Sequence, residues 1–207
     1  GKPSAAVPAQ ALALTGSSGD DVISATGAAQ TNSGGFGNDT LIGGAFDDWL
    51  SGDAGNDRLV GGGGRNQLFG GDGMDTYVLG PTDGGTTISD RHVTATAQTE
   101  VDTIEFGAGI LPGETRLIKD GGDLVVAMKN GAAQARIQGY YNTSVPTTTG
   151  TSYTDRKIER FQFADGTVWN GIQIAAHIEA GTPNAQTGTA SDDMFIVDSD
   201  LDTVTEL

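Results

Sequence analysis

The chain has 207 residues, enough for one or two small domains with a real core. Its 27 acidic residues against 11 basic ones give a net charge of −16, which argues against nucleic acid or an anionic membrane as a partner because both are polyanions. The absence of cysteine excludes disulfides and thiolate metal sites, and no apolar run of about 18 residues is present that could insert into a bilayer.

The chain opens with a stretch of small residues, GKPSAAVPAQALAL. It lacks the charged start and the long apolar centre of a signal peptide. We therefore expect residues 1–15 to be a linker.

Residues 16–78 repeat with a period of nine and hold 17 of the chain's 33 glycines, mostly in the first, second and fourth places of each block. A fixed short period indicates a stacked repeat architecture. The sixth place reads Asp21, Gln30, Asp39, Asp48, Asp57, Asn66 and Asp75. The eighth place reads Ile23, Asn32, Leu41, Leu50, Leu59, Leu68 and Tyr77.

Six loop residues followed by three strand residues make one half-turn, and two half-turns make one coil. The eighth residue then points inward and its neighbours point outward, as the period of a strand requires. Residues 18 apart stack at about 4.8 Å, the spacing of paired strands. A disordered acidic linker is the alternative, but a linker has no reason to keep the eighth place apolar.

The odd blocks place Asp21, Asp39, Asp57 and Asp75 in one column, whereas the even blocks place Gln30, Asp48 and Asn66 in the other. Unit charges about 5 Å apart repel by roughly 1 kcal/mol per pair in water, so a bare carboxylate ladder opposes its own folding. A hard divalent cation between two rungs turns this repulsion into a net attraction. Flexible coordination by about six oxygens favours Ca²⁺ over Mg²⁺, and two histidines with no cysteine argue against zinc or copper.

These nonamers resemble the RTX (haemolysin-type calcium-binding) repeat, G-G-x-G-x-D-x-U-x with U a large apolar residue. The resemblance implies an all-β, right-handed parallel β-roll over 16–78, with each Ca²⁺ held by two sixth-place carboxylates and several loop carbonyls. The implied strong sites are Asp21/Asp39, Asp39/Asp57 and Asp57/Asp75, and Asp48 opposite Asn66 is a weaker fourth. The implied carbonyl donors are Gly16, Ser18, Gly34, Gly35, Phe36, Gly37, Gly52, Asp53, Ala54, Gly55, Gly71 and Gly73.

Two departures from the pattern stand out. Phe46 replaces a glycine, which a loop with positive φ tolerates badly. The second block carries Gln30 and Asn32 in its key places, so we expect it to cap the roll without a good ion.

After the roll, residues 79–99 are expected to form a connecting and capping segment, where Asp83 or Asp90 could close a further site. Strand-like runs joined by Asn-Gly and Asp-Gly turns predict a small antiparallel β module with one short helix over 100–180. This module resembles the domain that often follows RTX blocks in secreted bacterial proteins. Residues 187–207 restart the nonamer, with Asp193 in a sixth place, and predict a truncated second repeat block.

No catalytic constellation is visible, since the two histidines have no nearby nucleophile and the usual hydrolase motifs are missing. We therefore expect a non-enzymatic, extracellular Ca²⁺-binding segment of a larger secreted protein. It would fold on binding Ca²⁺ after export, stiffen an adhesin-like structure and contact only flanking domains of the same polypeptide. The alternative is the export and folding domain of a secreted lipase or protease whose catalytic part lies outside this chain.

Overall fold

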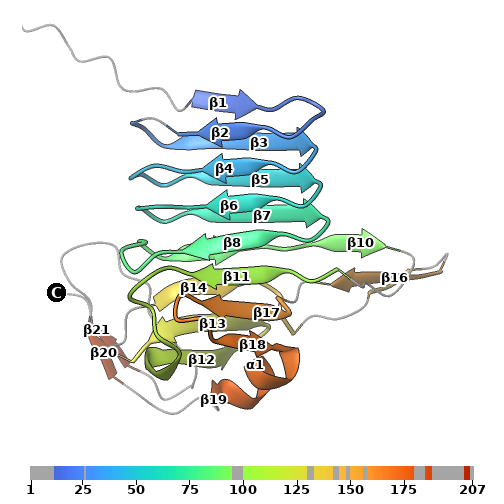
Figure 1. The fold of residues 1–207 in the computed structure, drawn as a ribbon. Coiled ribbons are helices and arrows are strands. Elements are labelled where there is room, and N and C mark those ends of the chain that lie inside the picture. The colour runs from blue at the N-terminus through green and yellow to red at the C-terminus, as the bar shows by residue number, and fades with distance from the viewer. Residues whose placement is uncertain are drawn as a thin grey trace, which may run out of the picture.

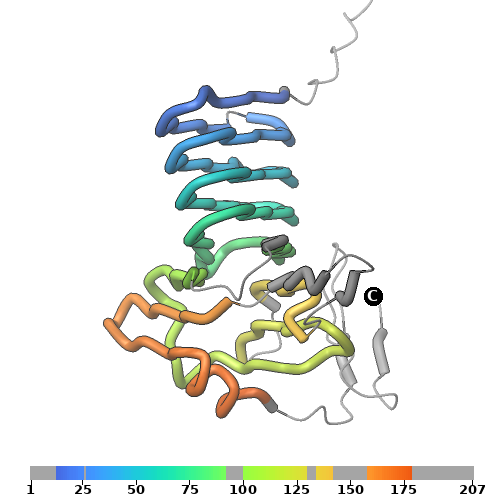
Figure 2. Tube along the Cα trace, turned by 90° about the vertical axis from the view of Figure 1, so that its right-hand side faces the viewer, coloured from blue at the N-terminus to red at the C-terminus, as the bar shows by residue number. Residues whose placement is uncertain are grey.

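The computed structural model of the protein describes residues 12–25, 27–94, 100–129, 133–141, 145–147, 150–155, 158–179, 185–187 and 203–205. The N-terminal half is a stack of flat coils, and the later strands continue the stack at its far end (Figures 1 and 2). The regular secondary structure of the described residues is almost entirely β-strand, with one short α-helix and one 3-10 turn.

The coils place alternate strands in two facing parallel sheets. One sheet contains β2 (Val22–Ser24), β4 (Thr40–Ile42), β6 (Arg58–Val60) and β8 (Thr76–Leu79). The other contains β1 (Leu12–Thr15), β3 (Gln30–Phe36), β5 (Trp49–Ala54), β7 (Gln67–Asp72) and β9 (Thr86–Ile88). Within the nonamers, paired residues are 18 apart, as Leu41 with Leu59 and Leu50 with Leu68 illustrate. The parallel β-roll that the period predicted is confirmed.

The core of the roll is the column of eighth-place side chains between the two sheets. Leu41, Leu50, Leu59, Leu68 and Tyr77 are completely buried. Ile23 in the first odd block remains 8% exposed. The inward direction of the eighth place follows from the strand period, and apolar burial there is the main favourable term that holds the sheets together.

The strands after the roll form antiparallel hairpins, as the turn signals predicted. β12 (Thr115–Asp120), β13 (Asp123–Met128) and β14 (Ala133–Ile137) are antiparallel neighbours, and β17 (Arg160–Phe163) pairs with β18 (Val168–Asn170). The helix α1 (Gly171–His177) is capped at its N-terminus by Asn170, whose side chain accepts the N–H groups of Ile172 and Gln173. The remaining elements are β10 (His92–Thr94), β11 (Thr103–Phe106), η1 (Pro112–Glu114), β15 (Val145–Thr147), β16 (Gly150–Asp155) and β19 (Ile178–Glu179).

The hairpins are joined to the roll by parallel pairs, so the two sheets run through both parts. β8 pairs with β11, which pairs with β17, and β9 pairs with β14. The sheets therefore have nine and seven strands, with the orders β1-β3-β5-β7-β9-β14-β13-β12-β19 and β18-β17-β11-β8-β6-β4-β2. One apolar cluster extends from Ile23 in the first coil to Ile174 in α1. The sequence did not indicate this continuity.

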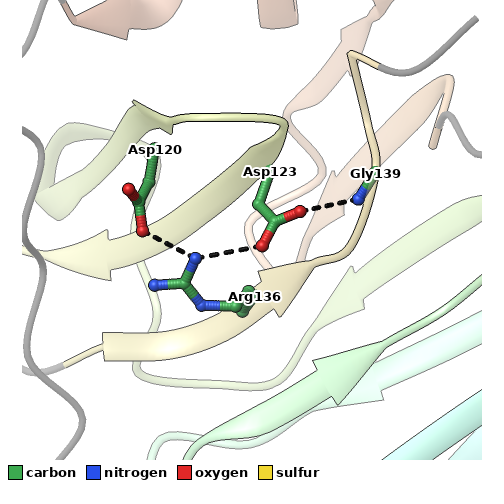
Figure 3. A network of polar contacts seen from close by, with 4 residues as sticks. All are labelled: Asp120, Asp123, Arg136 and Gly139. Atoms are coloured by element: carbon green, nitrogen blue, oxygen red, sulfur yellow. Dashed lines mark hydrogen bonds and ion pairs between the residues drawn. The ribbon is translucent and has the colours of Figure 1, made fainter.

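Two arginines form ion pairs that fasten the later strands. Arg136 on β14 contacts the carboxylates of Asp120 at 2.6 Å and Asp123 at 3.1 Å, and Asp123 also accepts the N–H of Gly139 at 2.7 Å (Figure 3). On the other sheet, Arg58 of the roll donates two hydrogen bonds to Glu105 of β11, at 2.7 and 3.1 Å. The Arg58–Glu105 pair crosses from the roll to the module.

The N-terminal boundary of the roll differs from the prediction. Leu12–Thr15, expected to belong to the linker over 1–15, instead form β1, which pairs with β3, and Leu14 packs against the core. Residues 1–11 lie outside the described residues. For the same reason the second block does not cap the roll: its strand β3 lies between β1 and β5.

The segments around the module add further strands. The connection 79–99 contains β9 and β10, and β10 pairs antiparallel with β16. Of the predicted second repeat block, the structure describes β20 (Ala185–Thr187) and β21 (Thr203–Thr205), which pair in parallel with an offset of 18 residues. Asp193 lies outside the described residues. Over the part of the chain that is described, no helix is long and apolar enough to cross a bilayer.

Candidate metal centre

The loops between the strands form the two edges of the roll. We call first edge the loops 16–21, 34–39, 52–57 and 70–75, which end at the four sixth-place aspartates. We call second edge the loops 25–30, 43–48 and 61–66, which end at Gln30, Asp48 and Asn66. The first edge holds seven aspartates and no basic residue, whereas the second holds two aspartates and one arginine. The charge is therefore concentrated on one side.

Three of the four sixth-place side chains on the first edge, those of Asp39, Asp57 and Asp75, accept a backbone N–H of the coil before them. Oδ1 of Asp39 accepts the N–H of Asp21 at 2.8 Å, Oδ1 of Asp57 that of Asp39 at 2.7 Å, and Oδ1 of Asp75 that of Asp57 at 2.8 Å. A carboxylate that accepts a backbone N–H has a fixed orientation. The structure thus brings Asp21, Asp39, Asp57 and Asp75 into one ladder, as predicted.

The second carboxylate oxygen points into the loop. Oδ2 of Asp39 and Oδ2 of Asp57 are buried, and neither has a hydrogen-bond partner among the described residues. Leaving a charged, buried oxygen unsatisfied is costly. Such an oxygen is therefore an open acceptor position for a ligand.

First-place glycines leave the space that this ligand needs. A Cβ atom at Gly52 would overlap Oδ2 of Asp57 and lie 2.7 Å from the carbonyl oxygen of Gly70. At Gly34 it would overlap Oδ2 of Asp39 and lie 2.8 Å from the carbonyl oxygen of Gly52. A carboxylate oxygen and a carbonyl oxygen therefore face the same small space in each loop.

Positive φ angles separate the loops with unsatisfied oxygens from the first loop. The second and fourth places have φ of 104° and 116° at Gly35 and Gly37, and of 76° and 138° at Asp53 and Gly55. Gly71 and Gly73 of the last loop are similar, at 117° and 124°. Asp53 is the one non-glycine residue with positive φ in the part of the chain that is described. Aspartate is among the few residues that tolerate this region.

The first loop is arranged differently. Ser17 has no positive φ, and its N–H and hydroxyl both donate to Oδ2 of Asp21, at 2.6 and 2.8 Å. These two hydrogen bonds lower the pKa of Asp21. The predicted carbonyl donors Gly16 and Ser18 lie in this loop. The remaining predicted donors lie in the positive-φ loops, namely Gly34, Gly35, Phe36, Gly37, Gly52, Asp53, Ala54, Gly55, Gly71 and Gly73.

Burial and neighbouring negative charges both raise the pKa of Asp57, in the middle of the ladder. Asp57 is 2% exposed, and its pKa is raised from 3.8 to about 6, mainly because burial disfavours the ionised carboxyl. The neighbouring carboxylates Asp39 and Asp53 raise it further, and the N–H of Asp39 opposes the shift. Without a bound ion, the Asp57 carboxyl therefore resists ionisation.

The ladder continues beyond the nonamers, which the sequence analysis missed. Oδ1 of Asp102 accepts the N–H of Asp75 at 2.8 Å, and the N–H of Asp102 donates to Glu159 at 2.9 Å. Thr103 donates to the carbonyl of Asp75 as Thr76 does to that of Asp57. The available signal was Asp-Thr before an apolar strand residue, which Asp102-Thr103 shares with Asp39-Thr40.

The sequence analysis also missed the hydrogen bonds between residues in the fifth place of the nonamer. The N–H of Asn38 donates to Oδ1 of Asp20 at 2.7 Å, that of Asn56 to Oδ1 of Asn38 at 2.9 Å, and that of Met74 to Oδ1 of Asn56 at 2.8 Å. These exposed side chains form a second, outer ladder beside the aspartates. The recurrence of Asp or Asn in place five was its signal.

The two connection aspartates have different surroundings. Asp83 closes a local turn, because its Oδ2 accepts the N–H of Gly80 at 2.7 Å. Asp90 is completely buried and is close enough to Tyr77 to raise the pKa of its hydroxyl, after the larger effect of burial.

The donor set fits Ca²⁺. The described residues contain no group of three or more His, Cys, Asp or Glu side chains placed to hold a metal. A site on the first edge would instead combine two aspartates with backbone carbonyls, all of them hard oxygen donors in a flexible loop. That is the coordination Ca²⁺ accepts and Mg²⁺ does not favour.

The stacked coils and the oxygen-lined first edge define a metal-binding β-roll. Residues 33–68 and 53–81 match the family model of the RTX calcium-binding nonapeptide repeat, and residues 123–172 match that of the haemolysin-type calcium binding protein related domain. The chain therefore carries RTX calcium-binding nonapeptide repeats, followed by a haemolysin-type calcium binding protein related domain, and Ca²⁺ is the ion that such repeats bind.

The other comparisons add little. The crystal structure of the extracellular lipase LipA from Serratia marcescens has a TM-score of 0.30 and 15% identity, and covers 63% of this chain. The chain spans 38% of that lipase. A comparison with curated protein sequences gives no match.

The close approach of Oδ2 of Asp57 to Gly52 predicts that this glycine cannot be replaced without a loss of stability. We expect Gly52→Ala to lower the free energy of unfolding in Ca²⁺ by about 1–3 kcal/mol, because its methyl group would overlap Oδ2 of Asp57. Gly19→Ala is the matched control, since a Cβ there meets nothing within 4 Å. Denaturant titration of both variants measures this difference. Equal effects would contradict the claim that the space beside Gly52 is needed.

The raised pKa of Asp57 predicts the pH dependence of the calcium-free protein. A carboxyl whose pKa is higher in the folded state favours folding below its ordinary value of 3.8, and this contribution is lost as pH rises through about 6. After removal of Ca²⁺ on a chelating resin, the unfolding free energy should therefore fall between pH 4 and 7. Asp57→Asn should flatten this slope, whereas Glu114→Gln, at an exposed site, should preserve it.

The extension of the ladder predicts a role for Asp102 in joining the module to the roll. Asp102→Ala removes the acceptor of the buried N–H of Asp75 and should cost about 1–3 kcal/mol. Asp102→Asn keeps an acceptor oxygen and should cost less. Thermal unfolding in Ca²⁺ tests both variants. A midpoint of Asp102→Ala equal to that of the wild-type protein would show that the contact contributes nothing.

Proposed function

We propose that this chain is the Ca²⁺-responsive module of a larger secreted bacterial protein, which closes on binding Ca²⁺ after export and then acts as a stiff structural or adhesin segment. The single observation that carries the proposal is the pair of buried, unpartnered oxygens, Oδ2 of Asp39 and of Asp57, facing carbonyl oxygens across glycines. We assign the strongest sites to the spaces between Asp39 and Asp57 and between Asp57 and Asp75.

The mechanism is coupled binding and folding. Where Ca²⁺ is scarce, the first edge carries seven aspartates without a basic residue, and their repulsion opposes closure. In an extracellular medium, sites with a Kd of about 10⁻⁴–10⁻³ M fill. Each site at ten times its Kd adds about 1.4 kcal/mol, a substantial share of the stability of a small domain.

The stiffening role is supported by the continuity of the two sheets. Because the roll and the later hairpins share strands and one core cluster, ordering of the coils extends into the module without a flexible joint. The parallel pairing of β20 and β21 at an offset of 18 residues favours a further repeat block after the module. A second block suits a spacer better than an export domain that ends soon after its roll.

The test is a titration with Ca²⁺ and, separately, Mg²⁺, followed by circular dichroism and small-angle scattering. We expect Ca²⁺ to raise the β-signal and reduce the radius of gyration, with Mg²⁺ much less effective at equal concentration. Asp57→Ala should remove up to two bound ions because Asp57 is shared by two sites. Glu114→Gln is the charge-matched control. Full order in excess chelator, with no response to Ca²⁺, would overturn the proposal.

A further inference from the structure

The two edges of the roll share one backbone arrangement. On the second edge, Oδ1 of Asp48 accepts the N–H of Gln30 at 2.8 Å, and Oδ1 of Asn66 accepts that of Asp48 at 2.9 Å. These contacts have the same 18-residue offset and nearly the same lengths as those of the first edge. Any difference between the edges therefore arises from the other atom of each side chain, which points into the loop.

At Asn66 that atom is a hydrogen-bond donor. Its Nδ2 donates to the carbonyl oxygens of Gly62 and Gly63, at 3.1 and 3.2 Å, and the side chain is 1% exposed. A Cβ atom on Gly61 would lie 2.8 Å from this Nδ2. On the first edge, the equivalent position at Gly52 meets Oδ2 of Asp57. The amide group thus stands where the first edge presents a bare oxygen, and it satisfies the loop carbonyls that a cation would otherwise bind.

The loop of Asn66 has the backbone geometry of the calcium-binding loops. Gly62 and Gly64, in the second and fourth places of their block, have φ of 77° and 83°. On the first edge, Asp53 and Gly55 occupy the same two places and also have positive φ. Because the backbone is similar, the difference in chemistry lies in the side chain at place six.

The sixth-place carboxylate of this edge, that of Asp48, is also satisfied internally. Oδ2 of Asp48 accepts the N–H of Gly44 at 2.7 Å, whereas Oδ2 of Asp39 and of Asp57 have no partner among the described residues. Phe46 in the fourth place of this loop does not adopt positive φ, so the loop differs from its glycine-containing counterparts. Arg65 in place five adds a positive charge to this edge, which lowers its demand for a cation further.

From these contacts we infer that the Asn66 amide replaces a metal ion and makes the second edge independent of Ca²⁺, so that ions bind along the first edge alone. The inference rests on the proposed Ca²⁺ response and specifies it. It also revises the expectation of a weaker fourth site between Asp48 and Asn66. The sixth-place residue, Asp or Asn, then selects between an ion and an internal amide in otherwise similar loops.

Exchanging the two residue types tests the inference. Asn66→Asp replaces the donor by a second carboxylate oxygen next to Asp48. We expect it to add one bound Ca²⁺ per chain by isothermal titration calorimetry and equilibrium dialysis, and to lower the thermal midpoint in chelator. Asp57→Asn is the reciprocal variant: it should lose Ca²⁺ and raise the midpoint in chelator. An unchanged stoichiometry and an unchanged midpoint for Asn66→Asp would overturn the inference.

A second measurement, on the wild-type protein, tests the inference even if a variant fails to fold in chelator. In the wild-type protein in saturating Ca²⁺, the side-chain NH₂ protons of Asn66 should exchange slowly with water by NMR, because both are held in the loop. Rapid exchange would show that the amide does not hold the loop carbonyls and would contradict the inference. A wild-type protein that binds no Ca²⁺ would remove the proposed function, yet the chelator midpoints of the Asn66 variants would still report whether the amide closes the second edge.

Discussion

The structure depends on one repeated contact, in which a sixth-place side-chain oxygen accepts the backbone N–H of the residue 18 positions earlier. This contact fixes the spacing of successive coils and, at the same time, turns the second side-chain atom into the loop. On the first edge that atom is an oxygen of Asp39 or Asp57 without a partner among the described residues, so the geometry that stacks the coils also creates an electrostatic cost. In the proposed function, Ca²⁺ binding relieves that cost. The fold and the candidate metal centre are then two results of one hydrogen-bond pattern.

The nonamer period was sufficient to predict the roll, its parallel register and the buried eighth-place column. These properties follow from local spacing, since a strand alternates its faces and a coil of 18 residues returns to the same position. The ladder of Asp21, Asp39, Asp57 and Asp75 could be placed for the same reason. The period could not predict whether the second oxygen of each carboxylate accepts a hydrogen bond within its own loop. Ser17 bonds Oδ2 of Asp21, and Gly44 bonds that of Asp48, because the second place of those loops does not adopt positive φ. Glycine permits both signs of φ, so its presence alone does not predict which one a loop adopts.

Long-range pairing was the other limit. The hairpins of the module were visible in their turn residues, but the parallel pairs of β8 with β11 and of β9 with β14 join segments separated by up to about fifty residues. No turn signal specifies such a pair. Asp102 was overlooked for a related reason, because it lies outside the nonamer frame and takes its place in the ladder only through the β8–β11 pairing.

The unequal edges have a consequence for the calcium-free molecule. Under the inferred arrangement, loss of the ions weakens the coils along the first edge only, while the internal bonds of Asp48 and Asn66 keep the second edge closed. The two sheets can then separate by rotating about that intact side, in the manner of a hinge. Water and proteases would reach the leucine column from a single direction, and the first peptide bonds to be cut would be those of the aspartate-rich loops.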